Sequence, residues 1–268
     1  MKTQPISVCL ISGPEAERIG LALASVAGWT AEMVVLLNDD VADGTAQVAE
    51  RFGARVYREP WKGFVGQKNS VCDKASQPWI LGLDADEVVS EALKEEIQRT
   101  VSALGSGEEP AAFSFPRCTS YCGRWIRHGD WYPDRVTRLW RKSAARWEGT
   151  EPHAYLRVQG SVRRLRGDLH HFSNESIDRQ IGKIIPYSDA FVQDARERGR
   201  RASMLDLATR PWWRFVRAYV FRLGFLDGWQ GYHIAWMGAF HTVTRYAKLR
   251  QAQTSPRPQQ AAPGSLNP

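Results

Sequence analysis

Three carboxylates follow a short apolar run in WILGLDADEVVS, residues 79–90. If the apolar run is a strand that continues through them, period-two alternation aims Asp84 and Asp86 the same way. Two carboxylates that share a small space repel each other unless a cation or a proton intervenes. Mg²⁺ and Mn²⁺ prefer oxygen ligands, and the phosphates of a substrate often complete their coordination shell. One prediction for this pair is therefore a metal site. The alternative is that Asp86 and Glu87 favour the N-terminus of a helix that starts near Ser90.

Segments with strand and helix periodicity alternate around this stretch. We expect strands at 6–12, 33–37, 54–57, 79–83 and 113–115, and helices at 15–27, 46–52, 64–75 and 91–104. Such alternation predicts an α/β layer fold with a mostly parallel sheet. Because ligands bind beyond the carboxyl ends of parallel strands, Asp84 and Asp86 stand where a ligand is expected.

The alternation ends after about residue 115. Residues 117–172 resemble short strands and loops, helix returns from Ser176 to about Arg200, and the last residues are rich in Pro, Gln and Ala without periodicity. We therefore expect a catalytic domain over 1–175, a C-terminal helical region over 176–250 that docks on a membrane or a partner, and a disordered tail over 251–268.

The net charge of +7 is concentrated in one segment, because residues 196–250 hold eleven Lys or Arg against three acidic residues. This asymmetry favours one anionic surface as partner. Within it, RPWWRFVRAYVFRLGFL (210–226) predicts a helix with an arginine face opposite an aromatic and aliphatic face, typical of a helix in a membrane interface. Docking on the catalytic domain or on a second subunit remains open. Nucleic-acid binding is not expected, since no recognised binding motif is present.

The cysteines and the apolar runs exclude several classes. Cys9, Cys72, Cys118 and Cys122 lack zinc-type spacing with histidines, so no zinc site is expected and a reduced, cytoplasmic setting is. For Cys118 and Cys122 we expect two ordinary thiols, with a redox-active pair as the alternative. No signal peptide is visible, and no window approaches the roughly 18 apolar residues of a spanning helix.

Several motifs together resemble family 2 glycosyltransferases, and most closely the bacterial group that includes lipopolysaccharide core β-glycosyltransferases. In chain order they are ISVCLIS, DGT (43–45), GFVGQKN (63–69), ILGLDADE, GRWIRHGDWYPDRVTRLWR (123–141) and GDLHHFS (167–173). The resemblance covers roughly residues 6–190. It implies the GT-A fold and a nucleotide-sugar donor, with UDP-hexose as the expected one.

The resemblance also implies a metal centre. Asp84 and Asp86 would hold a Mg²⁺ or Mn²⁺ ion that bridges the donor's diphosphate and offsets charge as the sugar–phosphate bond breaks. Asp86 is the stronger candidate for direct ligation. His171 matches a position where some GT-A enzymes add a metal ligand, and a structural histidine is the alternative.

Nucleotide-sugar binding is expected at the ends of the early strands and in the GQKN motif. Lys68 suits a contact to the nucleotide or its phosphates. The full set expected to bind the nucleotide sugar is Glu15, Asn38, Gln67, Lys68, Asn69 and Asp84.

Two positions depart from the family pattern. Asn38 stands where relatives have an Asp that contacts the base, and it exchanges the charge for an amide donor. Ala154 stands where relatives commonly have the Glu of VHE, although an inverting transfer needs a base for the acceptor hydroxyl. Asp134, in an intact WYPDR setting, is the first candidate for that base and Glu151 the second.

The sequence thus predicts a metal-dependent, inverting glycosyltransferase, peripheral on the cytoplasmic face of the inner membrane and able to form a homo-oligomer. It would transfer a sugar to a lipid-linked or lipopolysaccharide-core acceptor. The alternative is a catalytically retired relative that binds a glycan or a partner at the membrane.

Overall fold

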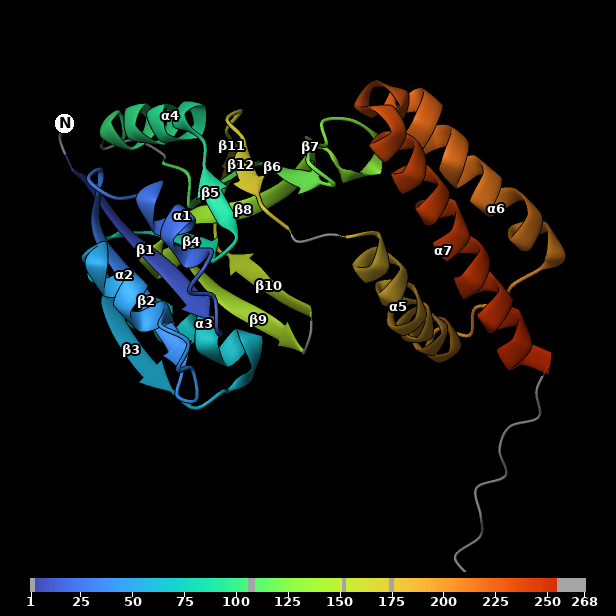
Figure 1. Ribbon diagram of the computed structural model, residues 1–268, viewed down its shortest axis with the longest axis horizontal. Coiled ribbons are helices and arrows are strands. Elements are labelled where there is room, and N and C mark those ends of the chain that lie inside the picture. Colours follow the sequence, from blue (N-terminus) through green and yellow to red (C-terminus); the bar gives the residue numbers. More distant parts are fainter. Residues whose placement is uncertain (1–2, 106–108, 151–152, 174–175, 255–268) are drawn as a thin grey trace, which may run out of the picture. The chain divides into compact units, whose positions relative to one another are not determined.

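The computed structural model describes residues 3–105, 109–150, 153–173 and 176–254 (Figure 1). The chain forms two compact units. The first contains residues 1–120 and 131–173, and the second contains residues 121–130 and 174–268.

The first unit is built on one mixed sheet with the strand order β3-β2-β1-β4-β8-β6-β12-β5. Its parallel half consists of β1 (Gln4–Ser12), β2 (Thr30–Asn38), β3 (Arg55–Glu59) and β4 (Trp79–Asp84). Then β8 (Asp134–Arg141) runs antiparallel between β4 and β6 (Ala112–Tyr121). The remaining strands are β12 (Leu169–His171), β5 (Glu87–Val89) and β11 (Val162–Arg164), with β9 (Ala145–Thr150) and β10 (His153–Val158) as a separate hairpin. The predicted α/β class is confirmed.

Helices cover both faces of the parallel half (Figure 1). Apolar residues of α1 (Ile19–Ala24), α2 (Thr45–Arg51) and α4 (Glu91–Ser102) pack on one face in the large core. On the opposite face α3 (Gly63–Asp73) and the β9–β10 hairpin form a smaller cluster around Trp140 and Trp147. A glycine at 82 makes room there, since a Cβ on it would lie 2.7 Å from the Trp140 ring.

The helix expected over 15–27 is shorter in the structure. It is confined to α1 because the main-chain N–H groups of Glu15 and Ala16 donate to the side chains of Thr45 and Asp43 instead of entering a helical ladder. This local bonding holds the loop after β1 against the start of α2.

The second unit is helical. It contains α5 (Ile177–Glu197), α6 (Met204–Val216) and α7 (Gly228–Thr254), together with the short β7 (Arg124–Trp125). A π-helical turn over Arg217–Phe221 and a 3₁₀ turn over Gly224–Asp227 join α6 to α7. The helix expected over 210–226 therefore ends at Val216. Residues 251–254, expected to begin a disordered tail, form the last turn of α7, and 255–268 lie outside the described residues.

The arginine face expected on α6 points inside its own unit. Arg214, Arg217 and Arg222 all pair with the carboxylate of Asp130 at 2.7, 2.9 and 3.1 Å, and the Asp130 side chain is only 7% exposed. Arg210 pairs with Asp206 one turn earlier. These arginines are thus paired with carboxylates of their own unit while they stay between 35% and 56% exposed, and their contact with a membrane stays a prediction.

Large apolar side chains lie on the outside of this helical unit. Among the most exposed are Leu205 (70%), Phe221 (66%) and Trp212 (65%), followed by Trp213, Trp229 and Phe240. Exposed apolar clusters of this kind mark interaction surfaces. Within the described residues no helix is long and apolar enough to cross a membrane.

Candidate active site

A cavity of about 720 Å³ opens in the first unit at the carboxyl ends of β1, β2 and β4. This volume is within the range of about 300–1,000 Å³ that is typical of small-molecule sites. Six of the residues expected to act here line it, namely Glu15, Asn38, Lys68, Asp84, Asp86 and His171. Three others, Gln67, Asn69 and Asp134, are not among its lining residues, and Glu151 lies outside the described residues.

The DGT motif shapes one rim of the cavity. The Asp43 carboxylate accepts hydrogen bonds from the N–H and hydroxyl of Thr45, and its other oxygen accepts one from the N–H of Ala16. The Thr45 bond is the main reason why the pKa of Asp43 is lowered. Between them Gly44 caps α2 at φ 94°, a left-handed conformation that glycine adopts without a Cβ clash. The motif thus fixes the loop that carries Glu15.

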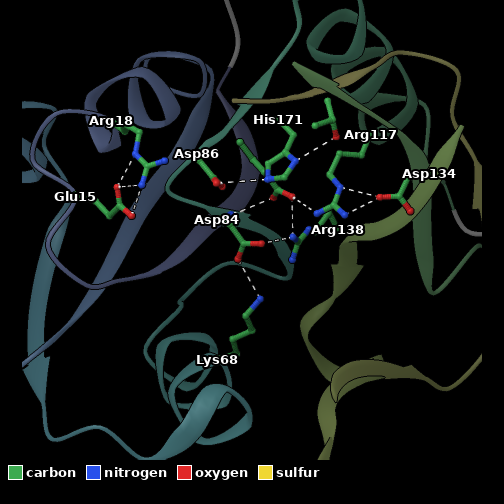
Figure 2. A network of polar contacts seen from close by, with 11 residues as sticks. Glu15, Arg18, Lys68, Asp84, Asp86, Arg117, Asp134, Arg138 and His171 are labelled. Atoms are coloured by element: carbon green, nitrogen blue, oxygen red, sulfur yellow. Dashed lines mark hydrogen bonds and ion pairs between the residues drawn. The ribbon is translucent and has the colours of Figure 1, made fainter. Parts of the chain in front are cut away.

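Asp84 ends β4 between two cations (Figure 2). Its Oδ1 accepts from Lys68 Nζ at 3.0 Å, and its Oδ2 accepts from Arg138. Burial by itself raises the pKa of Asp84, but the charges of Arg138 and Lys68 outweigh it and hold the pKa well below its usual range. Both carboxylate oxygens are therefore engaged by the protein.

Arg138 extends this contact into a buried charge network (Figure 2). Its Nη2 also donates to Glu87 at 2.7 Å, and the Glu87 side chain is fully buried. Arg117 contacts Glu87 at 3.3 Å and donates twice to Asp134 Oδ2, at 2.9 and 2.6 Å. The three carboxylates and three cations, with Lys68 included, balance in formal charge, which a buried cluster requires.

Sequence reasoning missed Arg138 and Arg117. A signal was present for Arg138, because in DRVTRLWR it lies next to Leu139 and Trp140 in the buried part of a strand. An arginine at such an inward position needs a buried acidic partner. Nothing local identified that partner as Asp84 and Glu87.

Asp86 and His171 form a second polar pair on the cavity wall. Asp86 Oδ2 lies 3.4 Å from His171 Nε2, and both side chains are partly exposed to the cavity. The other ring nitrogen of His171, Nδ1, lies 3.2 Å from the Thr119 hydroxyl, which fixes the ring orientation (Figure 2). Within the described residues no group of three or more acidic, His or Cys side chains could hold a metal by itself. The Asp86 carboxylate and the His171 imidazole are thus two groups at the cavity that suit a divalent cation.

An amide, that of Asn38, and two aromatic rings also line the cavity. Gln67 is buried on α3 and donates to Asn38 Oδ1 at 3.2 Å, so the Asn38 amide N–H₂ is left as a donor. Trp61 and Phe64 meet edge to face at 5.0 Å and are about half exposed, at 49% and 43%. The sequence analysis did not single out these two rings. Exposed aromatic faces beside amide donors suit a planar heteroaromatic ligand.

Three further candidates occupy different surroundings. Both ends of the Asn69 amide bond the main chain of Trp147, at 2.9 and 3.0 Å, so its side chain ties α3 to β9. Asp134 is 43% exposed at the start of β8, and its contacts with Arg117 leave Oδ1 as an available acceptor. Ala154 packs against the smaller apolar cluster, and its methyl group is no proton acceptor.

Comparisons with known proteins agree on one family. Residues 7–164 match the family model described as glycosyl transferase family 2. An uncharacterized glycosyltransferase of Rickettsia prowazekii (strain Madrid E) is 30% identical over 260 residues, which cover 91% of this chain and 86% of that protein. The lipopolysaccharide core biosynthesis glycosyltransferase LpsC of Rhizobium meliloti (strain 1021) is 28% identical over 255 residues, 92% of each chain.

A solved structure shares the fold. The mannosyltransferase from Pyrobaculum calidifontis, in complex with GDP-Man and Mn²⁺, aligns with a TM-score of 0.51 at 10% identity, covering 95% of this chain and 89% of that one.

Proposed function

The chain belongs to glycosyl transferase family 2 and has the GT-A fold, and we propose that it transfers a hexose from a UDP-sugar to a lipid-linked or lipopolysaccharide-core acceptor. One observation carries the proposal: the cavity beyond β1, β2 and β4 is lined both by charged and polar side chains, namely Lys68, Asp84, Asp86 and His171, and by the aromatic rings of Trp61 and Phe64. A nucleoside diphosphate sugar has the matching parts, an anionic diphosphate next to a planar base.

The charged and polar lining residues suit the diphosphate. Lys68 lines the cavity, its Nζ contacts Asp84 at 3.0 Å, and it is a compact cation for phosphate oxygens. Asp86 and His171 would hold Mg²⁺ or Mn²⁺, in the way that Mg²⁺ is commonly bound through one or two carboxylates with substrate phosphates completing its shell. Such an ion would offset the negative charge of the departing diphosphate. Asp84, whose oxygens already contact Lys68 and Arg138, positions these cations.

Asn38 and the two aromatic rings suit the base. The Asn38 amide would donate to a uracil carbonyl, and the rings of Trp61 and Phe64 would stack on its face. The exchange of Asp for Asn at this position therefore alters the hydrogen bond to the base without removing the contact.

Transfer would be an inverting, direct displacement. The acceptor hydroxyl oxygen attacks the anomeric carbon, the bond from that carbon to the diphosphate oxygen breaks, and the hydroxyl proton passes to a carboxylate. Among the described residues Asp134 is the candidate for this base, because its Oδ1 is open and Arg117 fixes its orientation. Glu151 remains the second candidate.

The acceptor class rests on the relative named for lipopolysaccharide core biosynthesis and on the helical unit. Exposed tryptophans such as Trp212, Trp213 and Trp229 are typical of side chains that lie in a membrane interface. We place the enzyme peripherally on the cytoplasmic face of the inner membrane, where such acceptors are built. The alternative is that a second copy of the chain covers this apolar surface.

The proposal is tested by calorimetric titration of the full chain with a panel of nucleotide sugars, with and without Mn²⁺. We expect one UDP-hexose to bind, with an affinity that rises with Mn²⁺, and Asp86→Asn to remove the Mn²⁺-dependent part. The matched control is Asp73→Asn, which removes an exposed carboxylate that contacts only Arg146 at 3.4 Å. Absence of binding by every nucleotide sugar with Mn²⁺ would reject the proposal.

A catalytically retired protein is the second candidate, and Ala154 is the observation that favours it. An alanine in an apolar cluster stands where relatives commonly have a glutamate. A retired protein would bind the UDP-sugar without turning it over. Release of UDP in the presence of a glycolipid acceptor, above the rate of Asp134→Asn, eliminates this alternative.

A further inference from the structure

A second cavity, of about 290 Å³, lies inside the helical unit. Its wall combines Phe191 of α5, Arg200 and Arg201 of the loop before α6, Arg210 of α6 and Tyr246 of α7. Its volume is near the lower end of the range for small-molecule sites, about 300 Å³. None of these residues belongs to the glycosyltransferase cavity.

One carboxylate lines this cavity, and it is already neutralised. Asp206 accepts from Arg210 Nε and from the N–H and hydroxyl of Ser203, with which it forms the capping box of α6. The hydrogen bond from Arg210 is the main reason why the pKa of Asp206 is lowered to about 2. Arg210 and Asp206 cancel in charge, so Arg200 and Arg201 stay without a counter-charge.

The neighbouring acidic side chains are engaged elsewhere. On α5, Asp189 pairs with Lys248 at 2.7 Å, Asp194 pairs with Arg198 at 2.7 Å, and Glu197 accepts from Gln193 at 3.2 Å. In the described parts of the chain, Arg200 and Arg201 have no ion pair with an acidic side chain. Residues 255–268 contain no Asp or Glu that could supply one.

A further cation lies behind the wall. The Arg245 guanidinium lies over the rings of Phe191 and Tyr246, at 4.9 and 5.5 Å, and the Arg210 guanidinium lies over Tyr246 at 5.2 Å. The buried Nε of Arg245 has no hydrogen-bond partner among the described residues. Burial, together with repulsion by Arg214 and Arg210, lowers the pKa of Arg245. Cations gathered in this way repel one another unless an anion joins them.

We propose that this cavity binds a phosphoryl group of an anionic phospholipid headgroup through Arg200 and Arg201. Each planar guanidinium group offers paired N–H donors whose spacing matches that of phosphate oxygens. Arginines that only faced solvent would not require this match. The lipid source follows from the neighbouring side chains: Met204 and Leu205, which directly precede Asp206, are 59% and 70% exposed. A cationic site next to exposed apolar side chains fits the boundary between anionic headgroups and acyl chains.

The test compares two double variants of the full chain. Arg200→Gln/Arg201→Gln removes two cavity cations, and Arg179→Gln/Arg196→Gln removes the same charge from exposed positions of α5 outside the cavity. Two probes are used: phosphatidylcholine vesicles with and without phosphatidylglycerol in a sedimentation assay, and inorganic phosphate at constant ionic strength in a thermal-shift assay. Far-UV circular dichroism confirms that both variants fold.

Loss of a charge-assisted hydrogen bond costs about 1.5–3 kcal/mol, which is roughly tenfold or more in affinity. We expect the cavity variant to lose at least about tenfold in binding to the phosphatidylglycerol vesicles, and the control to lose about threefold or less. A cavity-dependent shift with inorganic phosphate but not with vesicles would overturn the lipid assignment in favour of a soluble phosphate. Equal losses in both variants with both probes would overturn the site. Binding of UDP-sugar is measured separately, so failure here leaves the proposed transferase activity untouched.

Discussion

Removal of Arg138 should destabilise the first unit far more than removal of an exposed arginine. The Arg138 side chain is 7% exposed and contacts Asp84 and the fully buried Glu87. In Arg138→Met, Glu87 keeps the 3.3 Å contact from Arg117 as its one ion pair among the described residues, and its other oxygen still accepts from the Asp84 N–H at 3.1 Å. Breaking a buried ion pair by removing one partner costs about 3–5 kcal/mol. With about 2–4 °C per kcal/mol for a unit of this size, we expect Tm to fall by roughly 6–20 °C.

The matched control is Arg146→Met. Arg146 also pairs with an aspartate through its guanidinium, but at 3.4 Å with both side chains more than half exposed. Exposed pairs of this kind contribute about 0–1 kcal/mol, so its Tm should change by a few degrees at most. Thermal denaturation of both variants by circular dichroism measures the difference.

A double variant separates charge from packing. In Arg138→Met/Glu87→Gln the uncompensated carboxylate is gone, so a substantial part of the lost stability should return. If Arg138→Met is no less stable than Arg146→Met, the argument for a buried charge network is refuted. If Glu87→Gln restores nothing, the loss came from side-chain packing instead of charge.

Three further changes have distinct outcomes. Asp134→Asn should lower the turnover number by about 10²–10⁴-fold while leaving the Kd for the donor unchanged, because it removes a proton acceptor; a normal rate of UDP release would exclude Asp134 as the base. Lys68→Met should raise the Kd for UDP by about tenfold or more in calorimetry, since it removes a charge-assisted contact to phosphate; an unchanged Kd would place the diphosphate elsewhere. Gly44→Ala should cost about 1–2 kcal/mol in denaturant unfolding, because alanine is disfavoured at φ 94°; no loss would mean that the DGT turn relaxes.

The helical unit illustrates how a correct local pattern can lead to a wrong partner. Arg214, Arg217 and Arg222 do lie together, as their spacing predicts, and several large apolar side chains of the unit are exposed. Their partner, however, is Asp130, which is 84 residues before Arg214 in the chain. The three arginines stay 35–49% exposed beside Asp130, and large apolar side chains such as Phe221 and Trp212 are still more exposed, at 66% and 65%, so apolar side chains form much of the contact surface.

The sequence alone determined the α/β architecture and the place of the site. Hydrophobic periodicity reports which short segments are strands or helices, and the carboxyl ends of parallel strands then bring Glu15, Asn38 and Asp84 to one edge. The position of Asp86 could be predicted from Asp84, because it lies only two residues later in the DxD motif. The family motifs added Lys68 and His171, which also line the cavity.

Only the tertiary structure decided which charges meet. It showed that both oxygens of Asp84 are engaged by Lys68 and Arg138, that Asn69 holds β9 instead of facing the cavity, and that Arg200 and Arg201 stay unpaired beside a second cavity. Periodicity reflects interactions over a few residues, whereas an ion pair depends on the distance between groups far apart in the chain. That distance is set by the packing of whole elements, and sequence patterns do not contain it.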